Sequence, residues 1–461
     1  MHRIHSWAKA HASTPNTQSQ GQNQSNSQSS EDASAQDAQV KEGIRDPACP
    51  ESEKDANQTP ERGMFVRMKD GIVRFTGHTK RALCHSWVNV LLVFVPVGIA
   101  VEAAGLNPGL IFAMNAIAII PLAGLLSHAT ECVASRLGDT VGALINVTFG
   151  NAVELIIFSI ALVKNEIRIV QASLLGSILA NLLLILGMAF LLGGLRFQEQ
   201  IYNSTVTQMS ACLLSLSVMS LLLPTAFHAS WSDSGDADKY TLKVSRGTSV
   251  VLLLVYVLYI IFQLKSHAYL YASIPQQIID EESHPGVLAE FMNKPEMSRT
   301  AAVVMLLVST GLVAVCAEFL VDAIPTMIES SSVSEAFIGL IILPIVGNAA
   351  EHVTAVSVAT KNKMDLAIGV SVGSSIQIAI FVTPLVVILG WCMDKDMSLY
   401  FTLFETICLF VTAFVVNFLV LDGRSNYLEG SLLIAAYVII GVAAFYYPGS
   451  GQSSDLGTAG G

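Results

Sequence analysis

The chain has 461 residues, of which 52% are hydrophobic and only 13% charged, and its formal net charge is −11. Soluble domains average roughly 25% charged residues, so this composition excludes an ordinary soluble globular protein. Basic residues are sparse and scattered, which argues against a nucleic-acid-binding surface. The predicted fold class is an all-α polytopic membrane protein, with the lipid bilayer as its surroundings.

The N-terminal stretch differs in kind from the rest of the chain. It includes STPNTQSQGQNQSNSQSSEDASAQDAQ, which has almost no large apolar side chains and cannot bury enough surface to fold. We expect residues 1–61 to be a disordered cytosolic tail, followed by a juxtamembrane segment with an extra helix at 62–101. A regulatory tail and a merely solvated tail are both consistent with this composition.

Beyond the tail, the sequence holds long uncharged runs. A helix that spans a bilayer needs about 20 mostly apolar residues. Eleven stretches meet this requirement, at 82–101, 110–135, 141–163, 169–193, 204–224, 245–264, 299–323, 336–360, 365–393, 399–421 and 427–448. We therefore expect about eleven transmembrane helices and a short tail at 449–461.

The distribution of Lys and Arg predicts the orientation. With the N-terminus in the cytosol, 13 basic residues flank the spans on the cytosolic side and 6 on the opposite side. Because cytosolic flanks are enriched in Lys and Arg, this bias favours a cytosolic N-terminus and, after eleven crossings, a C-terminus on the far side. The linker at 265–298 is then cytosolic. Its acids Asp280, Glu281 and Glu282 either gather cations or are simply solvated.

The third and eighth predicted spans share a five-residue motif. GNAVE occupies 150–154 and GNAAE occupies 347–351, and the offset between them also relates the Gly-Ser pairs at 176–177 and 373–374. Two landmarks with one offset indicate a duplication, with five spans in each of the repeats at 110–264 and 299–448. An odd number of spans inverts the second repeat, which is typical of secondary transporters with an ion site near the midplane.

Glu154 and Glu351 lie near the middle of their spans, with Asn151 and Asn348 one turn before them. A lone polar residue in a span is often only a helix–helix hydrogen bond. Two glutamates at matched depth in matched repeats favour a functional site instead. Facing carboxylates repel one another unless they are protonated or a cation lies between them. The pair is therefore predicted to alternate between protons and a metal ion.

Oxygen ligands suited to a hard cation surround this pair. Ca²⁺ takes about 6–8 oxygen ligands, and Glu154, Glu351, Asn151 and Asn348 are the expected metal ligands. Supporting residues are expected at Ser177, Asn181, Ser374, Ser375, Gln377 and His352. His352 is a candidate for proton coupling, and a histidine satisfied by a neighbouring helix is an equal alternative. Gly150 and Gly347, which open the two motifs, are expected to loosen the helices and free backbone carbonyls.

A second set of acids lies near the ends of two equivalent spans. Glu131 is near the cytosolic end of 110–135, and Glu318 and Asp322 are near the far end of 299–323. Gating carboxylates and ordinary interfacial acids fit these positions equally well. The sequence has no HExxH motif, no phosphate-binding loop and no paired nucleophile and base, so neither an enzyme nor an ATP-driven pump is predicted.

With these residues, the chain resembles the Ca²⁺/H⁺ antiporter (CAX) family of the cation/Ca²⁺ exchanger superfamily. The resemblance is carried by ATECVASRLGDTVGALINVTFGNAVELI (129–156), EIRIVQASLLGSILANLLLILG (166–187), AEFLVDAI (317–324) and LPIVGNAAEHVTAVSVATKNKMDLAIGVSVGSSIQIAIFVTPL (343–385). The eleven spans with an acidic loop after the sixth resemble the fungal vacuolar type. One departure is Cys132 beside Glu131, where family members often have a second acid.

The resemblance implies a secondary antiporter that moves cytosolic Ca²⁺, or Mn²⁺, into an acidic compartment, driven by outward proton flow. It places the protein in the vacuolar membrane or another acidic endomembrane, with the N-terminus cytosolic and the C-terminus luminal. No cofactor is implied besides the transported Ca²⁺ and H⁺. The family's paired glutamates fall on Glu154 and Glu351, and its gating helices fall on 110–135 and 299–323.

Two other functions stay open at this point. They are a Na⁺-coupled Ca²⁺ exchanger and a Ca²⁺-permeable channel. Na⁺ coupling usually needs more than one cation site, and the single acid in each motif favours H⁺. A channel would respond to membrane potential without a pH gradient. The sequence does not fix the oligomeric state.

Overall fold

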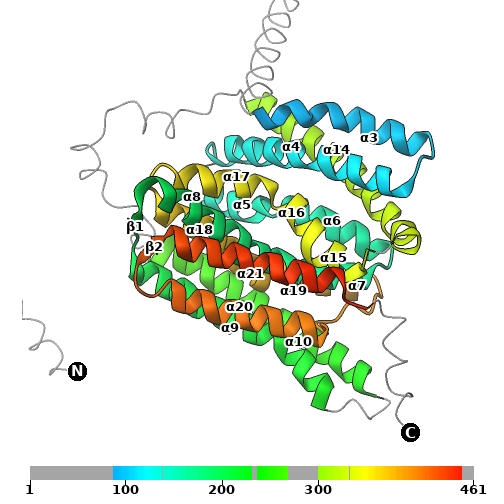
Figure 1. The fold of residues 1–461 in the computed structure, drawn as a ribbon. Helices are drawn as coiled ribbons and strands as arrows, with labels where there is room; N and C mark the ends of the chain where they lie inside the picture. Colours follow the sequence, from blue (N-terminus) through cyan, green and yellow to red (C-terminus); the bar gives the residue numbers. More distant parts are fainter. Residues whose placement is uncertain (1–86, 138, 231–235, 268–298, 332, 449–461) are drawn as a thin grey trace, which may run out of the picture. The chain divides into compact units, whose positions relative to one another are not determined.

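The computed structural model describes residues 87–137, 139–230, 236–267, 299–331 and 333–448. This part of the chain is almost entirely helical, as the apolar segments predict (Figure 1). Several predictions lie outside the described residues: the tails at 1–61 and 449–461, the juxtamembrane stretch before residue 87, and most of the acidic linker with Asp280, Glu281 and Glu282.

In the first half of the chain, helices occupy each predicted span. They are the 3₁₀ helix η1 (Trp87–Val93), α3 (Phe94–Ala103), α4 (Pro108–Ala134), α5 (Asp139–Gly150), α6 (Ala152–Val163), α7 (Ile167–Leu179), the π-helical turn η2 (Ala180–Ile185), α8 (Leu186–Phe197), α9 (Ser204–Ser230), α10 (Ala237–Ile261) and the π-helical turn η3 (Phe262–Ser266). Strand β1 (Glu199–Ile201) follows α8.

The second half repeats this helical character. Its elements are α14 (Arg299–Ser330), α15 (Glu335–Phe337), the π-helical turn η4 (Ile338–Ile342), α16 (Leu343–Gly347), α17 (Ala349–Ala359), α18 (Met364–Gln377), the π-helical turn η5 (Ile378–Val382), α19 (Thr383–Cys392), α20 (Leu403–Leu419) and α21 (Tyr427–Phe445). Strand β2 (Arg424–Asn426) precedes α21.

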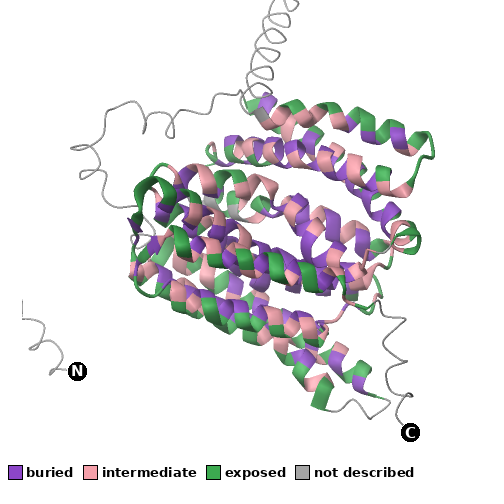
Figure 2. Cartoon of the chain, viewed as in Figure 1, coloured by how far each residue is buried: buried purple, intermediate pink, exposed green. Residues whose placement is uncertain are grey.

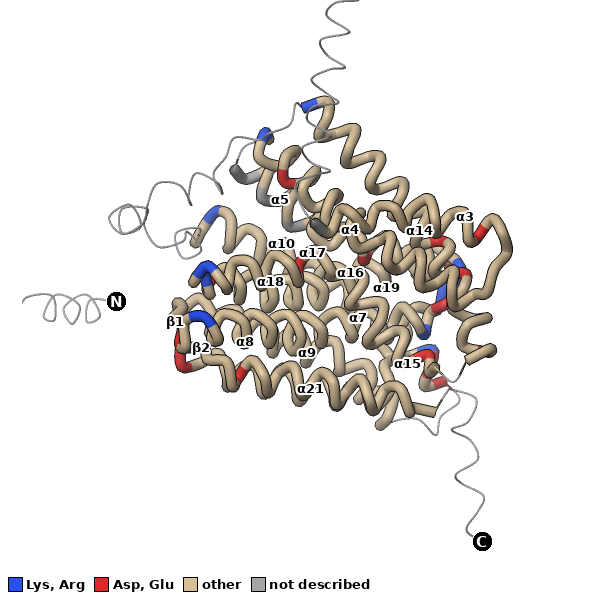
Figure 3. Tube along the Cα trace, turned by 45° about the horizontal axis from the view of Figure 1, so that its top comes forward, with Lys and Arg blue, Asp and Glu red and all other residues tan. Residues whose placement is uncertain are grey.

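Seven of the described helices are long and apolar enough to cross a membrane, and the count reaches nine if each of two bent pairs is one span. The bends are 48° between α5 and α6 and 60° between α16 and α17. The two remaining predicted spans hold shorter apolar helices, Val88–Ala103 and Leu403–Leu419. Figure 3 shows Lys, Arg, Asp and Glu mostly near helix ends, as expected of helices surrounded by lipid.

One short β-ribbon interrupts the helices. β1 pairs with β2 in antiparallel register, with Gln200 opposite Ser425. The Gln200 side chain donates to the Ala359 carbonyl at 3.0 Å and to Asn362 Oδ1 at 2.9 Å. Three connections that were all predicted to be cytosolic, those after α8, α17 and α20, therefore meet one another.

Several element boundaries recur in the two halves. Asn165 and Asn362, which are related by the offset of the sequence motifs, both turn the chain with a positive φ, of 68° and 59°. π-helical turns η2 and η5 follow equivalent helices. The same offset relates the starts of equivalent helices, at Ala152 and Ala349 (α6 and α17), Ile167 and Met364 (α7 and α18), and Leu186 and Thr383 (α8 and α19). The sequence repeat thus extends to the secondary structure.

The two bent spans lie between two groups of helices. α4 and α14 pack along one another and, with α3, lie at the top of Figure 1. α14 also contacts α6, while α4 contacts α16 and α17. On the other side lie α7–α8 and α18–α19. In their most apolar stretches 72% and 67% of the residues are buried, compared with 28% in α14 (Figure 2). The asparagine at each helix break is buried.

α7 approaches the second half of the chain most closely at Gly176. A Cβ atom placed on Gly176 would lie 2.5 Å from the Leu340 carbonyl oxygen and 2.7 Å from Pro344 Cγ. No side chain fits this space without movement of backbone. Gly373, the equivalent residue of α18, has no atom within 4 Å of an added Cβ.

We predict that Gly176→Ala lowers stability by about 1–3 kcal/mol, the usual cost of overpacking a core. Gly373→Ala is expected to be neutral or slightly stabilising, because alanine favours a helix over glycine. Thermal unfolding of the two purified full-length variants in detergent measures the difference. Equal unfolding midpoints would contradict the close packing of α7 against η4 and α16.

Candidate ion-binding site

Each bent span breaks at an asparagine. Asn151 separates α5 from α6 (φ −96°, ψ 22°), and Asn348 separates α16 from α17 (φ −91°, ψ 14°). Both asparagines are buried N-caps of the helix that follows. Glu154 and Glu351 therefore lie in the first turns of α6 and α17. The positive ends of two helix dipoles favour negative charge at these places.

The Glu154 side chain is buried against the break in the other half of the chain. Only 3% of the residue is exposed. A Cβ atom on Gly347 would lie 3.3 Å from Glu154 Cγ and 3.9 Å from its Oε1. This Oε1 atom is buried and has no hydrogen-bond partner among the described residues. The first half of the chain thus presents an unsatisfied carboxylate oxygen beside the α16–α17 break.

A series of hydrogen bonds links the two breaks. The Ser374 hydroxyl on α18 donates to Glu351 Oε1 at 2.8 Å and lies 3.4 Å from Asn151 Oδ1. Asn151 Nδ2 donates in turn to Gln377 Oε1 at 2.9 Å. The other carboxylate oxygen of Glu351, Oε2, is buried without a partner in the described part of the chain. Asn151 of the first half is therefore held by α18 of the second.

Asn348 leaves its side-chain oxygen open. Its Nδ2 donates to the Pro344 carbonyl at 2.9 Å, while no described group donates to its buried Oδ1. His352 Nδ1 donates to the Asn348 backbone carbonyl at 2.7 Å, and its Nε2 has no hydrogen-bond partner in the described structure. Because a carbonyl only accepts, Nδ1 carries a proton, and Nε2 of the neutral ring is an acceptor. His352 thus braces the helix break.

The arrangement fits a hard cation. Glu154 Oε1, Glu351 Oε2 and Asn348 Oδ1 are buried acceptors without donors among the described residues, and the Ser374 hydroxyl that bonds Glu351 also lies 3.4 Å from Asn151 Oδ1, one turn before Glu154. Neither glutamate has an ion pair with a described residue, and the described residues hold no cluster of three His, Cys, Asp or Glu side chains. Buried polar groups are normally satisfied. Carboxylate and amide oxygens are the ligands that Ca²⁺ and Mn²⁺ prefer.

The other polar residues expected around the pair are placed differently. Ser177 on α7 and Asn181 on η2 are buried, and their side-chain polar atoms find no partner among the described residues. Ser375 donates to the Ser371 carbonyl of its own helix at 3.0 Å, so its hydroxyl is already used. Gly150 is exposed, and an added Cβ there would meet no atom within 4 Å.

The acids predicted at the ends of α4 and α14 have different surroundings. Glu131, in the last turn of α4, is exposed. Glu318 and Asp322 on α14 both contact Lys164, whose Nζ lies 3.6 Å from Glu318 Oε1 and 2.5 Å from Asp322 Oδ1. The hydrogen bond to Asp322 raises the pKa of Lys164 above its ordinary value, so this lysine stays charged. Sequence reasoning missed this contact, although the predicted topology places all three residues on one side.

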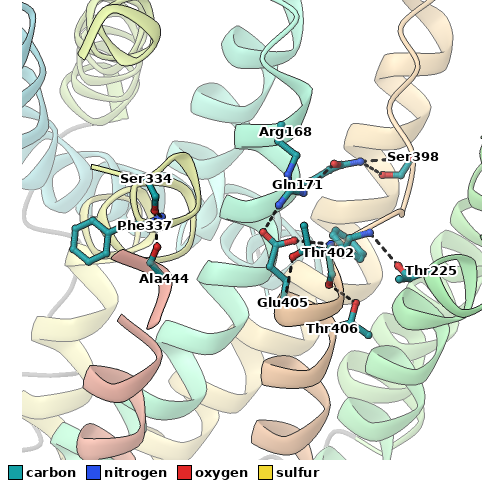
Figure 4. Close-up of polar contacts among 11 residues, drawn as sticks. Arg168, Gln171, Thr225, Ser334, Phe337, Ser398, Thr402, Glu405, Thr406 and Ala444 are labelled. Atoms are coloured by element: carbon teal, nitrogen blue, oxygen red, sulfur yellow. Dashed lines mark hydrogen bonds and ion pairs between the residues drawn. The ribbon is translucent and has the colours of Figure 1, made fainter. Parts of the chain in front are cut away.

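A buried ion pair was also not anticipated. Arg168 on α7 pairs with the fully buried Glu405 on α20 (Figure 4). Glu405 accepts from the Thr402 backbone N–H at 3.0 Å, and Thr402 Oγ1 accepts from the Glu405 N–H, which completes a capping box. Gln171 donates to the Ser398 carbonyl at 2.9 Å. The T-x-x-E spacing signals the cap, but nothing local signals a partner 237 residues away.

Comparison with known proteins identifies the family. Residues 108–265 and 301–446 match the sodium/calcium exchanger protein family. A vacuolar calcium ion transporter of Schizosaccharomyces pombe is 45% identical over 377 residues, which cover 82% of this chain and 89% of that protein. A Ca²⁺/H⁺ antiporter of Aphanothece halophytica is 43% identical over 361 residues, which cover 78% of this chain and 96% of that protein.

Solved structures agree with these relatives. Native YfkE has a TM-score of 0.66 at 34% identity, with 78% of this chain and 100% of YfkE covered. The H⁺/Ca²⁺ exchanger CAX, at 14% identity, has a TM-score of 0.58 over 80% of this chain and 93% of its own, and shares the fold. The chain belongs to the sodium/calcium exchanger protein family. The resemblance drawn from its motifs is confirmed.

We predict that Gly347→Ala lowers transport several-fold, because its methyl group would lie 3.3 Å from Glu154 Cγ and displace the carboxylate. Gly150→Ala, at the equivalent place in the first half, adds its methyl to open space and should stay close to wild type. Initial rates of ⁴⁵Ca²⁺ uptake into vesicles with matched protein levels compare the two. Equal losses would mean that glycine serves backbone freedom at the breaks rather than contact with Glu154.

Proposed function

We propose that the protein is a secondary active Ca²⁺/H⁺ antiporter that moves cytosolic Ca²⁺ into an acidic compartment. Relatives named vacuolar calcium ion transporter and Ca²⁺/H⁺ antiporter, at 45% and 43% identity over most of the chain, support this function. The observation that carries it is the pair of glutamates, Glu154 and Glu351, which the two halves contribute to one buried region with a free oxygen on each.

The proposed mechanism follows from charge. Two ionised carboxylates in an apolar interior repel one another and lack water, so the unloaded pair is stable only when it holds protons. A divalent cation between the carboxylates offsets both charges and makes protonation unfavourable. Ca²⁺ and H⁺ therefore exclude one another at the same oxygens. In an acidic lumen protons displace Ca²⁺, and at neutral cytosolic pH Ca²⁺ displaces protons.

Glu154, Glu351, Asn151 and Asn348 are the proposed metal ligands. Ca²⁺ needs about 6–8 oxygens, so backbone carbonyls at the breaks and water are expected to complete its shell. We assign the contacts of Ser374 and Gln377 to the positioning of Glu351 and Asn151. Mn²⁺ takes the same kinds of ligand, so ligand chemistry alone does not reject it. We propose no resident cofactor.

We also propose eleven transmembrane helices, with an extra helix before two inverted five-helix repeats. The element boundaries that the two halves share support the duplication. Contacts between connections support the alternating topology. Lys164 meets Asp322 and Lys395 meets Asn165 among connections assigned to the far side, whereas the β-ribbon joins connections assigned to the cytosol.

In this topology the N-terminus is cytosolic and the C-terminus luminal, in the vacuolar membrane or another acidic endomembrane. We propose that α4 and α14 gate the site, because this pair contacts both bent spans. Glu131 then lies at the cytosolic end of the gate, and Glu318 and Asp322 lie at its luminal end. α14 packs on α6, which carries Glu154, and α4 packs on α17, which carries Glu351. A single movement of α4 and α14 together would therefore change access to both glutamates.

Glu154→Gln and Glu351→Gln are each expected to lower transport by about 100-fold or more, since the dication loses one of its two charged partners and breaking a buried pair of opposite charges costs roughly 3–5 kcal/mol. Glutamine keeps the size of the side chain but neither balances a dication nor carries a proton. Ser375→Ala is the matched control, because Ser375 bonds only within α18. ⁴⁵Ca²⁺ uptake by folded, membrane-inserted variants is the measurement. Substantial uptake by either glutamine variant would falsify the paired-carboxylate mechanism.

Proton coupling gives a second prediction. In sealed vesicles that are acidic inside, ⁴⁵Ca²⁺ uptake should collapse when a protonophore removes the pH gradient while the membrane potential is clamped. The reason is that protons from the lumen are needed to displace Ca²⁺ from the carboxylates. Uptake that depends on a Na⁺ gradient would indicate Na⁺-coupled exchange, and uptake that follows voltage alone would indicate a channel.

A further inference from the structure

Lys164 contacts the acidic pair that lies at the luminal end of the proposed gate. It directly follows α6, and its Nζ reaches both Glu318 and Asp322, which lie one helical turn apart on α14. Exposure of the three side chains is 27%, 56% and 45%, so water and ions reach the group. Two solvent-accessible carboxylates on one helix face thus hold a cation that belongs to the protein itself.

Without Lys164, this pair offers oxygen ligands to a divalent cation. Residues four apart on a helix face the same direction, so both carboxylates can contact one ion. In the proposed topology the pair lies at the luminal end of α14, where Ca²⁺ leaves. Ca²⁺ retained there would stay close to the exit path and favour return to the site.

Stability alone does not account for the contact. Exposed ion pairs contribute little to folding. The same corner of the chain has a second contact, in which Lys395 Nζ donates to Asn165 Oδ1 at 3.3 Å. Lys164 is also joined to Glu154 by the rigid helix α6, about 15 Å away at 1.5 Å per residue. A single helix therefore carries both a proposed Ca²⁺ ligand and the ammonium group at the exit.

We propose that Lys164 is a positioning residue of the exit path. Its ammonium group is a tethered counter-cation that occupies Glu318 and Asp322, so that Ca²⁺ released into the lumen does not bind there again. Luminal Ca²⁺ is thereby kept at low apparent affinity. This inference rests on the proposed antiport and on its orientation.

The test measures the KM for Ca²⁺ separately on each side of the membrane. Sealed vesicles carry the full-length protein with its cytosolic face outward. Initial ⁴⁵Ca²⁺ uptake gives the cytosolic KM, and initial efflux from preloaded vesicles into acidic medium gives the luminal KM. The variants are Lys164→Gln, Lys164→Arg, the triple variant Lys164→Gln with Glu318→Gln and Asp322→Asn, and Lys395→Gln as the matched control. Lys395→Gln removes a positive charge at the same corner without touching the acids.

In Lys164→Gln, the luminal KM is expected to fall by about 30-fold, the effect of removing one unit charge about 4 Å from a dication in a solvated site. The cytosolic KM should stay unchanged. Lys164→Arg and the triple variant should keep the wild-type luminal KM, since the first preserves the counter-cation and the second removes the competing carboxylates.

Three results would overturn the proposal. One is an unchanged luminal KM in Lys164→Gln. If only the maximal transport rate of this variant falls, Lys164 has a structural role. Another is an equal shift in Lys395→Gln, which indicates a general surface-charge effect. The third is a shift confined to the cytosolic KM, which contradicts the assigned side. If the wild-type protein exchanges Ca²⁺ in these experiments, the proposed antiport function stands and only the role of Lys164 is rejected. If the wild-type protein shows no Ca²⁺ flux in either direction, both proposals are rejected.

Discussion

The site depends on breaking two membrane helices at a depth where a charge is expensive. A continuous helix would satisfy its backbone and project the glutamate sideways into an apolar interior, at a cost of several kcal/mol. At Asn151 and Asn348 the chain leaves helical geometry, and each glutamate falls in the first turn of a new helix. There the helix dipole favours negative charge. The breaks therefore make two buried carboxylates tolerable, and each carboxylate keeps an oxygen without a partner among the described residues, where we propose that the ion binds.

The surrounding helices keep these breaks opposite one another. The direct contact of Gly176 with η4 and α16 sets how closely the two halves approach. Ser374 and Gln377 on α18 then reach Asn151 from the second half of the chain. Farther out, the buried pair of Arg168 and Glu405 joins α7 to α20. Close backbone packing near the proposed site and the ion pair farther from it both hold α7 in place.

Much of this followed from the sequence, because it depends on composition and on exact repetition. Long apolar runs located the helices, and the repeated motif located both glutamates. The choice between Ser374 and Ser375 did not follow, since neighbours on a helix point about 100° apart and α18 carries polar residues on more than one face. The contacts of Lys164 and Arg168 join residues 158 and 237 positions apart. They depend on tertiary packing and have no local pattern.

The two halves share several boundaries but not these contacts, and this difference bears on how the proposed site would serve two compartments. An added Cβ at Gly347 would lie 3.3 Å from Glu154 Cγ, whereas one at Gly150 would meet no atom of another described element within 4 Å. Ser374 is hydrogen-bonded within the site, whereas Ser177 has no partner in the described structure. If the two halves are inverted repeats, the first half could take up the contacts that the second half makes here, and the second half those of the first. The resulting conformation would contain the same kinds of interaction, and its site would open to the opposite side of the membrane. The two states would then differ little in free energy, and the different affinities of an ion for them suffice to shift the population.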